Sequence, residues 1–164
     1  MATLNQIAVA ADEVPADTDV AWTGRTIKVP WFAEHMREEL VLHGWDITGD
    51  DAAAQARLAE PWMTTHSVFA VGRPLLAKGA KELGPGERIE ARLRATGTDD
   101  VVVSADANHT TIGLAGPDGP ATLETDAAAR VLLLWGRRPN DPSRICSRAG
   151  AETLGRVRRL LSGY

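Results

Sequence analysis

A glutamate and a histidine stand four residues apart in the stretch "EELVLHGWDI", residues 38–47. In a helix, Glu39 and His43 lie one turn apart on the same side, so both side chains can reach one small target. A carboxylate and an imidazole are common ligands of zinc and other divalent metal ions. The same spacing also occurs in an ordinary amphipathic helix, where such a pair contributes about 0.2–0.5 kcal/mol. Both interpretations stay open at this point.

Two ligands do not complete a metal site, so a third must come from elsewhere in the chain. His35 lies on the same helical stripe, but His35, Glu39 and His43 span about 12 Å of helix axis, which is too far for one ion. His66, on the helix that follows, is the nearby candidate for the third ligand. Its alternative is a solvent-facing position near the start of that helix.

Arginines are concentrated at the C-terminal end of a chain whose net charge is −4. Residues 130–164 contain eight arginines against only Asp141 and Glu152. A clamp for a carboxylate or another anion is one interpretation, and favourable placement of cations after a helix C-terminus is the other. Nucleic acid is not the expected anion, because interleaved aromatic residues and a known binding motif are missing. The candidate ligand-binding arginines are Arg137, Arg138, Arg144 and Arg148.

The composition is that of a globular protein, with 44% hydrophobic and 24% charged residues. The single cysteine, Cys146, excludes an internal disulfide framework and fits a reducing cytoplasm. No apolar run approaches membrane-spanning length, and the N-terminus lacks the layout of a signal peptide. We therefore expect a cytoplasmic protein that does not bind a membrane.

The apolar periodicity changes from helical to alternating near Gly84–Gly86. Before that point, residues 31–45 and 52–83 read as helices, with Asp50 or Asp51 as a cap and Pro61 as a break. After it, residues 88–95 alternate and further short strands follow, then a helix, a short strand and an amphipathic C-terminal helix. The predicted fold class is α+β with an antiparallel sheet and flanking helices.

Two stretches, "REELVLHGWDITGDD" and "LLLWGRRPNDPSRICSRAG", resemble the mycothiol-dependent maleylpyruvate isomerase family of actinobacteria. Members of that family join a DinB-like metal-binding helical bundle to a C-terminal domain similar to sterol carrier proteins. The resemblance implies that residues 1–83 form the end of the bundle with its connecting helices, and that residues 84–164 form the C-terminal domain. It also implies zinc or another divalent metal at Glu39 and His43, with mycothiol as the thiol cofactor. The histidine that an earlier bundle helix supplies in the family precedes the start of this chain.

Three functions are compatible with this resemblance. The first is metal- and thiol-dependent isomerase or transferase chemistry, with the site completed by His66, a second subunit or a partner chain. The second is a non-catalytic domain that holds a small apolar or anionic ligand, and the third is an interaction module. A bundle remnant would expose apolar side chains, so residues 1–45 are expected to pair with a second copy or a partner chain. Repacking of the segment "EPWMTTHSVFAVGRPLL" over those side chains is the alternative to a homodimer.

Overall fold

The computed structural model describes residue 9 and residues 12–161. The chain divides into two compact units, Met1–Glu39 and Leu40–Tyr164, and the boundary falls inside helix α2, Val29–Thr48. The predicted change near Gly84–Gly86 is present as the point where helices give way to the sheet. The division into residues 1–83 and 84–164 that the resemblance implies stays a prediction.

The first unit contains a two-stranded hairpin, β1 (Asp19–Trp22) and β2 (Arg25–Lys28), which leads into α2. The two residues between the strands, Thr23 and Gly24, have φ of 47° and 80°. Positive φ at both central positions is typical of the tight turns that match the twist of a hairpin.

The second unit begins with the rest of α2 and a series of short helices. Asp51 caps the next helix by accepting a hydrogen bond from the Ala54 backbone N–H at 2.7 Å. Pro61 occupies the first turn of a new helix, where its missing N–H has no cost. The predicted helix cap at Asp51 and the predicted helix break at Pro61 are therefore both present. The elements are α3 (Ala52–Leu58), α4 (Pro61–His66), the π-helix η1 (Ser67–Gly72), α5 (Arg73–Gly79) and the 3-10 turn η2 (Ala80–Glu82).

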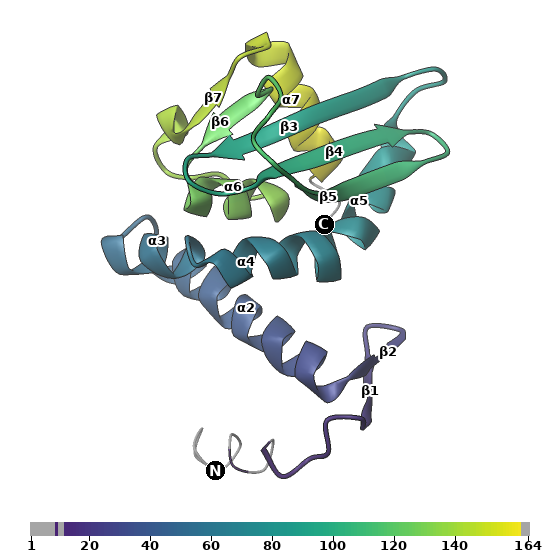
Figure 1. Cartoon of the computed structure of the whole chain (residues 1–164), viewed down its shortest axis with the longest axis vertical. Helices are drawn as coiled ribbons and strands as arrows, with labels where there is room; N and C mark the ends of the chain where they lie inside the picture. The colour runs from purple at the N-terminus through teal and green to yellow at the C-terminus, as the bar shows by residue number, and fades with distance from the viewer. Residues whose placement is uncertain (1–8, 10–11, 162–164) are drawn as a thin grey trace. The chain divides into compact units, whose positions relative to one another are not determined.

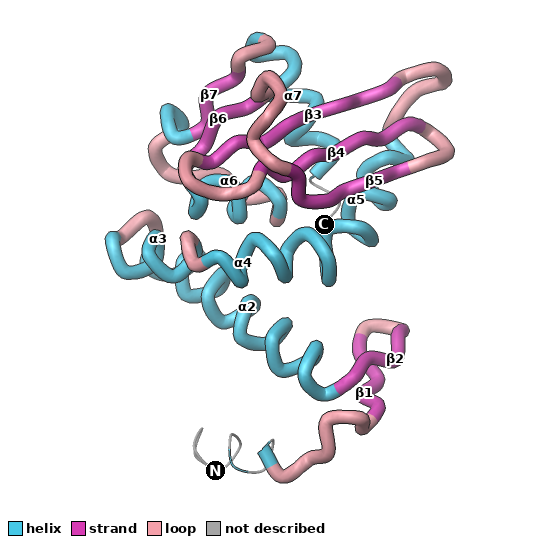
Figure 2. The backbone as a smooth tube through the Cα atoms, in the orientation of Figure 1, coloured by secondary structure: helices cyan, strands magenta, loops and turns pink. Residues whose placement is uncertain are grey.

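A five-stranded sheet follows, with the order β5-β4-β3-β6-β7 (Figures 1 and 2). The first three strands form the expected antiparallel meander. The chain then crosses back over the sheet, so β6 pairs with β3 in parallel. The sheet is therefore mixed rather than wholly antiparallel. The predicted α+β class is confirmed. The strands are β3 (Arg88–Ala95), β4 (Asp100–Asp106), β5 (Thr110–Ala115), β6 (Leu123–Thr125) and β7 (Ile145–Ser147).

Helices α6 (Ala127–Leu134) and α7 (Gly150–Leu161) both contact β3, and the 3-10 turn η3 (Pro142–Arg144) precedes β7. Nearly every residue of α6 is buried, which fits a helix that is apolar almost all round. The amphipathic α7 instead buries only Val157, Leu160 and Leu161. Among the described helices, none combines the length and apolarity needed to cross a membrane.

Candidate metal centre

Two chemically active side chains share one face of helix α2. His35, Glu38, Leu42 and Trp45 recur at intervals of three and four residues, so they lie on the same side of the helix. All four are buried, and Glu38 is fully buried at 0% exposure. Leu42 and Trp45 are ordinary core residues, whereas a buried carboxylate and a buried imidazole need polar or charged neighbours.

The imidazole of His35 is held among aromatic rings and carboxylates. Its ring centroid lies 4.9 Å from that of Trp31 and 5.9 Å from that of Trp22. His35 Nε2 lies 3.5 Å from Glu39 Oε1, and His35 Nδ1 lies 4.0 Å from Glu38 Oε2. Burial lowers the pKa of His35 from its ordinary value of 6.5, although the nearby charge of Glu39 opposes this effect. His35 is therefore neutral at pH 7, the form in which a histidine can bind a metal ion.

His66 is the last residue of α4 and is also buried, at 4% exposure. The neighbouring Ser67 fixes the backbone at this point, because its Oγ donates to the Met63 carbonyl at 2.7 Å. The same Oγ accepts a hydrogen bond from Trp135 Nε1 at 3.0 Å. The π-helix η1 starts immediately after His66, and π-helical turns inside helices are frequent at functional sites.

His35, Glu38 and His66 are all buried, and each offers a side-chain atom of a kind that can bind a metal ion. His35 and Glu38 also lie close together on one helix, with His35 Nδ1 4.0 Å from Glu38 Oε2. Two imidazoles and one carboxylate are a normal ligand set for zinc and for non-haem iron.

The predicted ligands Glu39 and His43 are not members of this group. Glu39 Oε1 faces His35, while the side chain of His43 is 63% exposed and its Nδ1 lies 3.0 Å from Asp46 Oδ2. Their role as ligands stays a prediction. The sequence interpretation missed Glu38, although its spacing to Leu42 and Trp45 already placed it on the buried face of the helix.

The four candidate ligand-binding arginines lie in different surroundings. Arg137 makes a bidentate contact with Asp46, at 2.8 and 2.7 Å. Arg144 contacts Asp126 at 2.7 Å and Asp50 at 3.1 Å, and Arg148 pairs with Glu124. Arg138 lines a cavity of about 100 Å³ together with Leu133, Gly136, Arg137, Arg158 and Arg159. Three of the four therefore join parts of the chain through carboxylates, and ligand binding by them stays a prediction.

The features that define this protein are thus an α+β fold and a buried group of two histidines and one glutamate. No family model, curated protein or solved structure matches the chain.

Proposed function

We propose that this chain binds a divalent metal ion through His35, Glu38 and His66. The observation that carries the proposal is a buried histidine and a buried glutamate on one face of α2, with His35 Nδ1 4.0 Å from Glu38 Oε2. The buried His66 is the proposed third ligand. Burial strengthens it, because a buried carboxylate is costly unless a cation or hydrogen-bond donors compensate its charge.

The number of ligands favours a reactive site over a purely structural one. Structural zinc sites use four protein ligands, whereas catalytic sites use three and leave a position open for water or substrate. The proposed set has three protein ligands, which fits the second class. Zinc and another transition ion that accepts nitrogen and oxygen ligands are both compatible with this set.

We further propose that the metal serves thiol-dependent isomerase or transferase chemistry, with mycothiol as the thiol. The resemblance of the stretches at residues 37–51 and 132–150 supports this step. A zinc ion with an open position supplies a Lewis acid and a binding position for a thiolate. The part assigned to the protein is to hold the ion away from bulk water and to keep the imidazole of His35 neutral.

Titration of the metal-stripped protein with zinc tests the metal proposal. We expect saturation near one equivalent, with affinity at least about tenfold weaker in His66→Gln, which is about 1.4 kcal/mol. His109→Gln is the matched control, because His109 lies exposed in the turn between β4 and β5. Equal affinity of the wild type and His66→Gln would contradict the proposal. Circular dichroism establishes that each variant is folded.

The thiol step has a separate readout. Cobalt-loaded protein that binds N-acetylcysteine through sulfur should gain a near-ultraviolet thiolate-to-cobalt charge-transfer band. Protein that binds cobalt without gaining this band would contradict thiol binding and leave the metal proposal intact.

A further inference from the structure

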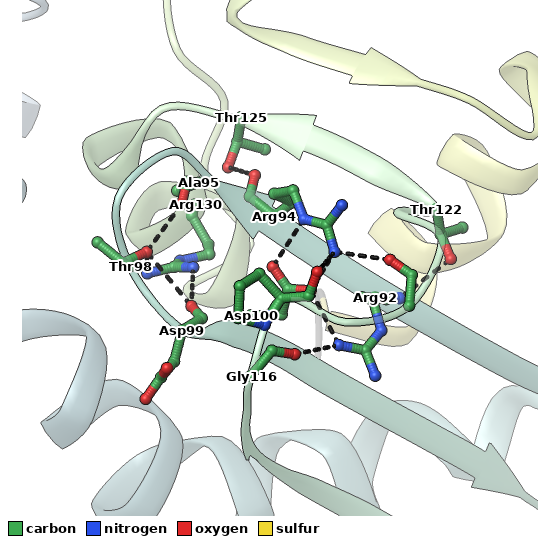
Figure 3. Close-up of polar contacts among 12 residues, drawn as sticks. Arg92, Arg94, Ala95, Thr98, Asp99, Asp100, Gly116, Thr122, Thr125 and Arg130 are labelled. Carbon is green, nitrogen blue, oxygen red and sulfur yellow. Dashed lines mark hydrogen bonds and ion pairs between the residues drawn. The ribbon is translucent and has the colours of Figure 1, made fainter.

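Arg130 is a buried guanidinium in the middle of α6, with only 1% of the residue exposed (Figure 3). Its Nη1 donates to the Asp99 carbonyl at 2.7 Å. Its Nη2 donates to Thr98 Oγ1 at 3.0 Å and to Thr64 Oγ1 at 3.3 Å. All three acceptors are neutral oxygens. Its Nε is buried and has no acceptor among the described residues.

The charge of Arg130 has no ion-pair partner within the part of the chain that the structure describes. The carboxylates of Asp100 and Asp99, the acidic residues nearest to Arg130, do not pair with it. Asp100 is shared between Arg92 and Arg94, at 2.9 and 2.7 Å. The backbone carbonyl of Asp99 accepts a hydrogen bond from Arg130, whereas the Asp99 carboxylate points away from the guanidinium in Figure 3.

A guanidinium stays charged at neutral pH, and a buried charge is costly unless an opposite charge compensates it. Burial lowers the pKa of Arg130, and the charges of Asp100 and Asp99 oppose this effect only in part. An anion placed beside Arg130 would therefore be favoured.

Space for such an anion exists next to the guanidinium. Arg130 lines a cavity of about 300 Å³ between α4, the β3–β4 turn and the start of α6. The polar residues Thr64, Thr65, Thr98 and Asp99 also belong to its wall. Thr98 is held in place, because its Oγ1 donates to the Ala95 carbonyl at 2.9 Å. Apolar atoms of Leu114 and Ala127 complete one side.

We propose that this cavity binds the carboxylate or phosphate group of a small molecule, with Arg130 as the charged anchor. A guanidinium beside the Thr64 hydroxyl, whose proton has no acceptor among the described residues, is well suited to an oxyanion. The hydroxyls of Thr65 and Thr98 already donate to the carbonyls of Pro61 and Ala95. The volume of the cavity, about 300 Å³, is at the lower end of the range for small-molecule sites. None of the three proposed metal ligands lines it, so this inference does not depend on the metal proposal.

An NMR titration tests the proposal with inorganic phosphate and succinate as probes, at constant ionic strength set with chloride. We expect saturable one-site shifts of the Thr64, Thr65 and Thr98 amides and of the Arg130 Nε–H signal. The probe that binds more tightly identifies whether phosphate or carboxylate is the preferred group.

Matched variants separate this site from general attraction to a cation. Arg130→Gln should weaken binding at least tenfold, while Arg73→Gln, at an exposed position on α5, should leave it within twofold. Thr64→Val preserves shape and should weaken binding at least threefold, so the proposal stays testable if Arg130→Gln does not fold. Absence of saturable shifts with both probes in the wild type, or equal weakening by Arg73→Gln, would overturn it.

Discussion

At the scale of single residues, Asp100 shows how this protein stabilises a buried charge (Figure 3). Its side chain is fully buried, and Arg92 and Arg94 both donate to it. The same two arginines hold the β5–β6 connection, because Arg92 donates to the Gly116 carbonyl at 2.8 Å and Arg94 to the Gly119 carbonyl at 2.7 Å. Asp100 therefore fixes the path by which the chain returns across the sheet.

Asp100→Asn should lower the free energy of unfolding by about 2 kcal/mol at pH 7. This loss is smaller than for a pair with both partners buried, because both arginines are partly exposed. Urea unfolding measures it, and Glu90→Gln is the control. Glu90 pairs with Arg88 at the surface, so its removal should change stability very little.

The pH dependence gives an independent check on Asp100. Hydrogen bonding from Arg94, together with Arg92, holds the pKa of the Asp100 carboxyl below its ordinary value of 3.8. At a pH between the lowered pKa of Asp100 in the folded protein and its ordinary pKa of 3.8 in the unfolded chain, the unfolded chain binds more protons. The contribution of Asp100 to the free energy of unfolding is therefore complete above pH 3.8 and is lost as the pH falls further. The difference between wild type and Asp100→Asn should therefore shrink from pH 7 to pH 3. A constant difference would contradict this role.

At the scale of elements, helix α5 approaches helix α7 at a glycine. A Cβ atom built on Gly79 would lie 1.9 Å from the Leu160 carbonyl oxygen, a backbone atom that cannot turn aside. Gly44, inside α2, has no atom within 4 Å of such a Cβ. The two helical glycines therefore differ in packing although they are chemically the same.

Gly79→Ala should lower stability by about 1–3 kcal/mol or more, because the helices must separate to admit a methyl group. Gly44→Ala should raise stability by up to about 1 kcal/mol, because alanine is the better helix former. Thermal unfolding of the two variants provides the comparison. A Gly79→Ala protein as stable as Gly44→Ala would show that α5 and α7 are not in close contact.

The sequence predicted most elements well because their local signals were strong. Alternation at residues 88–95 marked β3, and the cap at Asp51 marked the start of α3. Helix α2 continues past Gly44 to Thr48, since Leu42 and Trp45 bury its last turns in the core. The parallel pairing of β6 with β3 could not be predicted, because a strand of only three residues has no sequence pattern that identifies its partner strand.

The metal group was only partly predictable for a similar reason. The sequence shows the spacing of Glu39 and His43 but not which side chains are buried. Glu38 and Glu39 are three and four residues after His35, so on a helix both are its neighbours. Only the packing of α2 distinguishes the two glutamates, since Glu38 is fully buried and Glu39 is not.

At the scale of the whole molecule, the uneven charge of the chain is partly neutralised internally. The arginine-rich C-terminal region suggested an external anion, yet Arg137 pairs with Asp46 and Arg144 with Asp50. Both acidic residues come from the strongly acidic first sixty residues. Arg130, which has no ion-pair partner among the described residues, lies in α6, a helix that the sequence predicted.

An apolar surface on α2 bears on self-association. Leu40 and Ile47 are seven residues apart on one face of the helix, and they are 73% and 85% exposed. Large apolar side chains left in water each forgo about 1.5–3 kcal/mol of burial. We propose that this face pairs with a second copy of the chain.

Sedimentation at micromolar concentration should show a mass above 17.6 kDa that falls to that of the monomer in Leu40→Asp. Ala56→Asp adds the same charge at an exposed position on α3 and should leave the mass unchanged. A wild-type monomer at every concentration would rule out the dimer.

The central claim, that His35, Glu38 and His66 bind a metal ion, is tested most directly by two adjacent glutamates. Metal content per chain should be measured by plasma mass spectrometry after zinc loading and gel filtration, in wild type, Glu38→Gln and Glu39→Gln. Each replacement removes one carboxylate and preserves size, so the variants differ only in which glutamate is lost. We predict about one zinc per chain in wild type and Glu39→Gln, and loss of zinc in folded Glu38→Gln. Zinc retained in Glu38→Gln and lost in Glu39→Gln would contradict the account and favour the ligand set of Glu39 and His43.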